Sequence, residues 1–224
     1  MFTYNTATDG AGLYQGTAVN CAFIFNTAIG GGGGMYQGTA TRSIFRNNRA
    51  SSGGGMHQGT AINCLFTLNS SGFYGGGMYQ GTAMNCSVAY NTAPLGSGLY
   101  EGAAVNCVIS GNTGANSQTS STLMSYSCLP TTMSGTGNIV GEPSFINPSL
   151  GDFRLRADSP CIDRGTSSGA PLVDLVGTVR PNGVGIDMGA YEYVPYSVFV
   201  PSVEGYLQAV ATTAIREADL TLGA

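Results

Sequence analysis

A unit of 21–22 residues recurs five times in the first half of the chain and constrains its fold more than any other feature. The copies are GLYQGTAVNCAFIFNTA (12–28), GMYQGTATRSIFRNNRA (34–50), GMHQGTAINCLFTLNSS (55–71), GMYQGTAMNCSVAYNTA (77–93) and GLYEGAAVNCVISGNTG (98–114). The equivalent residues Leu13, Met35, Met56, Met78 and Leu99 are 22, 21, 22 and 21 residues apart. A nearly constant period of this length is typical of a solenoid whose turns absorb the one-residue difference.

Within each copy, inward and outward residues alternate, which predicts strands rather than helices. Val19, Cys21 and Phe23 alternate with Asn20 and Ala22, and a period of two places one face of a strand in the core. The glycine runs between copies suit turns and are unsuited to the interior of a helix. We therefore predict an all-β fold, a right-handed parallel β-helix in which stacked coils lie about 4.8 Å apart.

Stacking brings equivalent residues of successive coils together as ladders. We expect an amide ladder at the turns, a glycine column at a corner with positive φ, and a small buried column of reduced cysteines with Ser43 in its gap. The amide ladder comprises Asn26, Asn48, Asn69, Asn91 and Asn112, the glycine column Gly16, Gly38, Gly59, Gly81 and Gly102, and the cysteine column Cys21, Cys64, Cys86 and Cys107. Cys128 and Cys161 lie outside this column, and the sequence leaves open whether they form a disulfide.

The scarcity of charge limits the partners of this chain. Only 9% of the 224 residues are charged, against roughly 25% in an ordinary globular domain. All eight basic residues are arginines and the net charge is −4, so a nucleic acid, which requires a basic surface, is excluded as a partner. The sequence has no apolar stretch long enough for a membrane-spanning helix and no signal peptide at its start.

The repeats resemble a known family of surface proteins. The strings Gly-Gly-Gly-Met and Phe-x-x-Asn, as in Phe23/Asn26, Phe45/Asn48 and Phe66/Asn69, are similar to the GGA[ILV]…FxxN repeat of polymorphic outer-membrane proteins. The last two copies depart from it, with Val88 and Ile109 in place of the phenylalanine. The resemblance covers about residues 10–114.

Two further resemblances lie beyond the repeats. GNIVGEPSFINPSLGDFRLRADSPCIDRGT (137–166) and DLVGTVRPNGVGIDMGAYEY (174–193) resemble the end of bacterial choice-of-anchor Q β-helix proteins, which implies an extracellular or cell-surface location. VPSVEGYLQAVATTAIREADLTLGA (200–224) resembles the opening of a PASTA module, including a short helix. We therefore expect a β-helix over residues 1–195, with terminal coils and a cap at 115–195, and a linker with an incomplete PASTA-like fragment at 196–224.

Catalytic residues are scarce in the repeats. Between residues 10 and 114 the charged residues are Arg42, Arg46, Arg49 and Glu101, whereas a glycosidase needs two carboxylates and a lyase commonly needs a base with an acidic Ca²⁺ cluster. The three arginines form either a local anion-binding spot or a solvated edge. Asp163 and Asp187, inside the terminal strings, suggest either a Ca²⁺ site or structural capping with Arg164 or Arg180. We expect no catalytic residue, no cofactor and no metal.

One surface column has the residue types of a contact site. Each aromatic residue directly follows the apolar Leu/Met column, so strand alternation points it outward, and a glutamine follows it. Tyrosine combines a flat apolar face with a polar tip, which suits sugars and protein partners. The alternative is that the rings only stabilise the sheet. The candidate binding residues are Tyr14, Tyr36, His57, Tyr79, Tyr100, Gln15, Gln37, Gln58 and Gln80.

These observations favour a non-catalytic, adhesin-like scaffold outside the cell or on its surface that binds a glycan or a surface protein. Two other functions stay open at this point. One is a carbohydrate-active enzyme, a polysaccharide lyase or glycoside hydrolase, with its acidic site on a missing part of the chain. The other is a structural spacer without a ligand.

Overall fold

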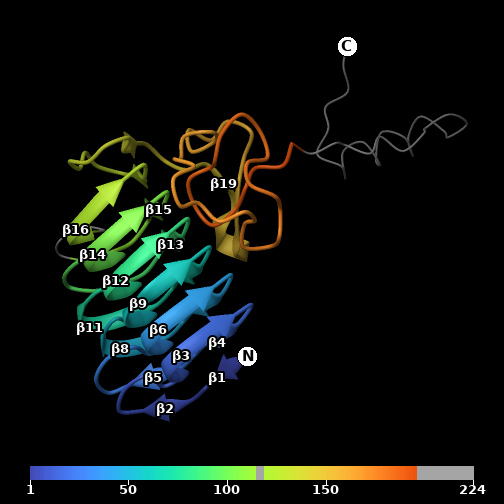
Figure 1. Cartoon of the computed structure of the whole chain (residues 1–224). Helices are drawn as coiled ribbons and strands as arrows, with labels where there is room; N and C mark the ends of the chain where they lie inside the picture. The colour runs from blue at the N-terminus through green and yellow to red at the C-terminus, as the bar shows by residue number, and fades with distance from the viewer. Residues whose placement is uncertain (115–118, 196–224) are drawn as a thin grey trace, which may run out of the picture. The chain divides into compact units, whose positions relative to one another are not determined.

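The computed structural model describes residues 1–114 and 119–195 and confirms a parallel β-solenoid (Figure 1). The long strands of successive coils form one sheet of the stack. They are β3 (Leu13–Val19), β6 (Met35–Thr41), β9 (Met56–Ile62), β12 (Met78–Met84), β14 (Leu99–Val105) and β16 (Thr119–Ser125). The fragment at 196–224, with its expected helix, lies outside the described residues.

Two further sheets of short strands complete the coils. The eight-stranded sheet contains β1 (Phe2–Thr3), β4 (Ala22–Ile24), β7 (Ile44–Arg46), β10 (Leu65–Thr67), β13 (Ser87–Ala89), β15 (Val108–Ser110), β17 (Cys128–Leu129) and β18 (Ile139–Val140). The four-stranded sheet contains β2 (Thr6–Ala7), β5 (Thr27–Ala28), β8 (Arg49–Ser52) and β11 (Ser70–Tyr74). All pairs within these sheets are parallel, and equivalent repeat positions pair, as Phe45 does with Phe66.

Residues with a left-handed backbone turn the chain between the sheets. Gly32, with φ of +66°, precedes a long strand, and Asn63, with φ of +50°, follows the next one. Glycine and asparagine tolerate this conformation better than other residues do. The glycine runs therefore precede the long strands and a left-handed residue follows them at the same place in each coil, with Arg42 in place of asparagine in the second copy.

The core of the solenoid is a set of inward ladders. The phenylalanine rings stack, with ring centroids 4.6 Å apart between Phe23 and Phe45 and 4.5 Å apart between Phe45 and Phe66. The expected asparagine ladder is confirmed, since Nδ2 of each side chain donates to Oδ1 of the next, for example over 2.9 Å from Asn48 to Asn69. These asparagines are buried, and Nδ2 of Asn48 also donates to the carbonyl of Phe23. The ladder thus satisfies backbone groups inside the stack.

The glycine column lies elsewhere than predicted. It falls inside the long strands rather than at a corner, and φ is +134° at Gly16 and +150° at Gly38. A Cβ at Gly38 would stand 2.5 Å from Cε of Met35 and 2.2 Å from the carbonyl oxygen of Gly16. The inward methionine occupies the space that a side chain would need, so Gly38 is required for packing as well as for backbone conformation.

The cysteines of the repeat are buried and free, as predicted for Cys64, Cys86 and Cys107, while Cys21 is partly buried. Cys128 and Cys161 are also buried free thiols, and both belong to one apolar cluster. This cluster joins β17 to the C-terminal segment.

The C-terminal segment lies along the side of the stack, whereas the sequence predicts a cap at its end. We call residues 145–193 the C-terminal layer; it contains the hairpin of β19 (Phe145–Asn147) and β20 (Asp152–Leu155) with a 3₁₀ turn at Pro148–Leu150. Figure 1 shows this layer beside the coils. Outward residues of the eight-stranded sheet, including Leu65 and Val108, form a second apolar core with it. The reason is that this face of the sheet is apolar and must be covered.

Candidate functional site

The predicted contact column lies on the long-strand sheet. In β6, Met35 and Ala40 are fully buried, whereas Tyr36, Gln37 and Thr39 between them are half-buried. Gln37 has φ of +51°, as its equivalents in the other coils do within a few degrees. This left-handed residue interrupts the in–out alternation of the strand, while equivalent residues of neighbouring coils still pair one to one. Tyrosine and glutamine therefore both reach the outer surface, and we call their columns the Tyr/Gln stripe.

The glutamines of the stripe are hydrogen-bonded into a continuous ladder. Nε2 of each residue donates to Oε1 of the next, from Gln15 to Gln37 over 2.8 Å and from Gln37 to Gln58 over 2.9 Å. Gln58 donates to Gln80 over 3.0 Å, and Gln80 donates to a carboxylate oxygen of Glu101 over 2.7 Å. Each inner amide keeps one N–H and one oxygen lone pair for another partner. The stripe is thus an ordered row of donors and acceptors.

The aromatic rings of the stripe differ along its length. Tyr14 is 55% exposed, whereas Tyr36, His57, Tyr79 and Tyr100 are half-buried. Tyr14 and Tyr36 stack with centroids 5.2 Å apart and planes within 2°. Stacked rings present their edges and hydroxyl groups, rather than their faces, to a ligand. This arrangement favours hydrogen bonding over ring stacking with a sugar.

His57 interrupts the tyrosine column. Its ring is tilted 68° to Tyr36, and its Nδ1 lies 1.9 Å from where a Cβ of Gly31 would be. Nδ1 is buried and has no hydrogen-bond partner among the described residues. Burial lowers the pKa of His57, and the nearby Asp9 opposes this effect. His57 is therefore a neutral, packed member of the stripe.

Tyr74 is part of this surface and was not predicted from the sequence. It ends β11, and its ring lies 5.6 Å from Tyr79 and 4.7 Å from Tyr100. Burial raises the pKa of Tyr79, with smaller contributions from Glu101, Tyr100 and Tyr74. The signal in the sequence was the string SSGFYGG, which places two aromatic residues where the two preceding coils have glycine or serine. One half of the stripe is therefore open and the other is partly covered.

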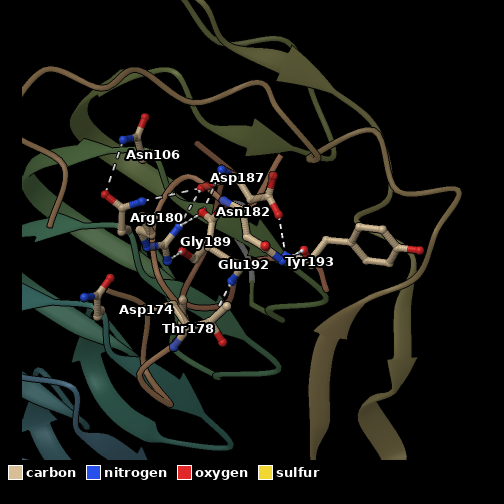
Figure 2. A network of polar contacts seen from close by, with 12 residues as sticks. Asn106, Asp174, Thr178, Arg180, Asn182, Asp187, Gly189, Glu192 and Tyr193 are labelled. Carbon is tan, nitrogen blue, oxygen red and sulfur yellow. Dashed lines mark hydrogen bonds and ion pairs between the residues drawn. The ribbon is translucent and has the colours of Figure 1, made fainter. Parts of the chain in front are cut away.

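The late acidic residues form a structural network in the C-terminal layer (Figure 2). Buried Arg180 pairs with Glu192 and donates to the carbonyl oxygens of Asp187 and Gly189 over 3.2 and 2.9 Å. Within the described chain Arg180 has an acidic partner, whereas Arg164, the other expected partner, forms no ion pair.

The carboxylates of this network are occupied by backbone N–H groups. Oδ1 of Asp174 accepts from Val176, Gly177 and Thr178 over 2.8–2.9 Å, and Oδ1 of Asp187 accepts from Asp163 over 2.8 Å. Burial raises the pKa of Asp187 to about 6. In the part of the chain that the structure describes, three potential metal ligands do not cluster anywhere. These side chains hold loops in place, as the capping alternative predicts.

No family model matches the chain, and no curated protein matches it. Among the described residues, no helix has the length and apolar character needed to cross a membrane.

Proposed function

We propose that this chain is a non-catalytic, adhesin-like scaffold outside the cell or on its surface, which binds a glycan or a protein partner through the Tyr/Gln stripe. The observation that carries the proposal is the glutamine ladder, which holds five polar side chains in one row beside the tyrosines. A row that is already ordered loses little side-chain entropy when a partner binds. Its open half offers the exposed ring of Tyr14 and the amides of Gln15 and Gln37.

The proposed location rests on the resemblance to choice-of-anchor Q and polymorphic outer-membrane proteins. The strings that resemble choice-of-anchor Q proteins contain residues of the hydrogen-bonded network. Asp187 and Glu192 lie in DMGAYEY, and Asp163 lies in SPCID. These residues hold the loops of the C-terminal layer in place, which is a physical reason for such strings to follow a solenoid of this kind.

A glycan array with the purified chain tests the proposal. The variant Tyr36→Ala/Tyr79→Ala should lose the bound glycan while its circular dichroism spectrum stays unchanged. A matched control is Tyr4→Ala/Phe25→Ala, which removes another outward stacked pair with centroids 5.1 Å apart. If the array shows no ligand, the same variants are compared for adhesion to cells. Loss of binding in the control alone, or no binding in either assay, would exclude the stripe as a contact surface.

The absence of catalysis is part of the proposal. Glu101 is the one carboxylate in residues 10–114, and its Oε2 accepts the hydrogen bond of Gln80. We expect no turnover of neutral or acidic polysaccharides. Turnover that disappears in Glu101→Gln would overturn this expectation and favour the carbohydrate-active enzyme.

A further inference from the structure

A cavity lies between the eight-stranded sheet and the C-terminal layer. Its volume is about 330 Å³, which is at the small end of the range for ligand sites. The solenoid contributes Arg46 and Thr67, and the layer contributes Phe153 and Tyr191. The cavity is on a different sheet from the Tyr/Gln stripe, so it is independent of the proposed function.

The walls of the cavity are mainly aromatic and aliphatic. Tyr90 and Phe153 approach each other from the two sides with ring centroids 6.1 Å apart and planes at 50°. Tyr191 adds a third ring, and burial raises its pKa to about 12, so its hydroxyl group stays protonated at neutral pH. Tyr90 and Phe153 are in contact and form one aromatic wall, and a wall of this kind in a space of this size suits one planar ring.

Two polar groups lack partners at this cavity. Arg46 is exposed and forms no ion pair or side-chain hydrogen bond with any described residue. Thr67 is only 3% exposed, and its hydroxyl has no hydrogen-bond partner within the described residues. Buried hydroxyl groups are normally hydrogen-bonded. Rotation of the Thr67 side chain about its Cα–Cβ bond brings the hydroxyl group to the place of the methyl group, so a ligand can become its partner. The guanidinium is suited to a carboxylate, which it can bind through two N–H groups.

Gly151 of the C-terminal layer lies beside the arginine. Gly151 has φ of +84°, and a Cβ added there would lie 3.8 Å from Nη1 of Arg46. The carboxylate of Asp152, the next residue in the chain, is paired with Arg154 at 2.6 Å. The charge of Arg46 is therefore not neutralised by that acid.

We propose that this cavity binds a small aromatic carboxylate that carries a ring hydroxyl group. The ring lies among Tyr90, Phe153 and Tyr191, the carboxylate pairs with Arg46, and the hydroxyl group bonds to Thr67. 4-Hydroxybenzoate is the simplest probe with these three features.

Ligand-detected NMR and calorimetry on the full chain test the proposal. Saturation transfer should reach the ring protons of 4-hydroxybenzoate, with a dissociation constant at or below about 1 mM. Arg46→Gln should weaken binding by about tenfold, because a charge-assisted hydrogen-bond pair is lost. Arg49→Gln, on the same coil but outside the cavity lining, should leave the affinity unchanged. Thr67→Val should weaken the binding of 4-hydroxybenzoate but not the binding of benzoate.

The probe series also tests the site without any variant. The methyl ester of 4-hydroxybenzoate has no charge and should bind about tenfold more weakly than the acid. No saturation transfer to the acid, equal affinity for acid and ester, or equal effects of Arg46→Gln and Arg49→Gln would each overturn the proposal. Because the glycan and adhesion assays report on another sheet, failure here and failure of the stripe are distinguishable.

Discussion

The solenoid and the C-terminal layer both bury polar side chains, but with different chemistry. In the solenoid the buried groups are neutral amides, and each asparagine bonds to the equivalent residue one coil away. In the layer they are charged, with Arg180 beside Glu192 and with Asp174 and Asp187 bonded to loop N–H groups. A repeat supplies an identical neighbour at each step, whereas loops without a ladder need side chains that accept several N–H groups. The stability of the layer should therefore depend on pH and that of the ladder should not.

The largest expected effect is on the solenoid core. Phe66 is fully buried and stacks on Phe45, so Phe66→Ala should lower the free energy of unfolding by about 3–5 kcal/mol. Urea denaturation measures this change. Phe73→Ala is the control, since Phe73 is 60% exposed and its loss should cost less than about 0.5 kcal/mol. Similar costs for the two would contradict the assignment of the core.

Removal of the buried cation should affect the layer rather than the solenoid. Arg180→Met leaves the buried carboxylate of Glu192 unpaired, and we expect a loss of about 3 kcal/mol or more. Hydrogen exchange should show weaker protection in residues 145–193 and unchanged protection in 10–114. Arg156→Met removes an exposed pair with a 3.6 Å separation and should cost less than about 1 kcal/mol. Uniform loss of protection would show that the two regions unfold together.

The pH dependence separates the two regions further. The pKa of Asp187 is raised from 3.8 to about 6, so the folded state retains a proton that the unfolded state releases. The free energy of unfolding should fall by about 2 kcal/mol as pH rises from about 4 to above 6, with solvent screening allowed for. Asp187→Asn should lack this component when both proteins are titrated by urea denaturation. An identical pH profile for the two proteins would contradict the assignment.

The smallest expected effect distinguishes the two halves of the Tyr/Gln stripe. Tyr79 contacts the rings of His57, Tyr74 and Tyr100, whereas Tyr14 contacts Tyr36. Tyr79→Ala should therefore cost roughly 0.5–1.5 kcal/mol more than Tyr14→Ala in thermal or urea unfolding. A larger cost for Tyr14→Ala would mean that the open half supports the sheet.

Much of the solenoid follows from the sequence because its contacts are repeats of one local pattern. The register of Phe45 on Phe66, the asparagine ladder and the burial of Cys64 could all be predicted from spacing alone. The left-handed backbone of Gln37 could not, because a glutamine in this conformation carries no composition signal. The same conformation explains why tyrosine and glutamine both lie outside.

The repeat spacing does not determine what covers the outward face of the eight-stranded sheet. Leu65 has outward parity beside inward Phe66, and an apolar residue there indicates that something covers the sheet. The sequence does not say what covers it, because alternation identifies a buried face and not its partner. The aromatic cavity near Arg46 depends on that partner and could not be predicted either.

The sequence by itself determined the coil, its period and its inward ladders, since each residue there meets its own equivalent one repeat away. Only the tertiary structure decided where residues 145–193 lie and which charges they bury. Contacts such as those of Ser87 with Ala190 and Asn106 with Thr166 join positions 103 and 60 residues apart without any repeat between them. Such contacts form because one apolar sheet face and one set of loops fit each other in shape and in hydrogen bonding.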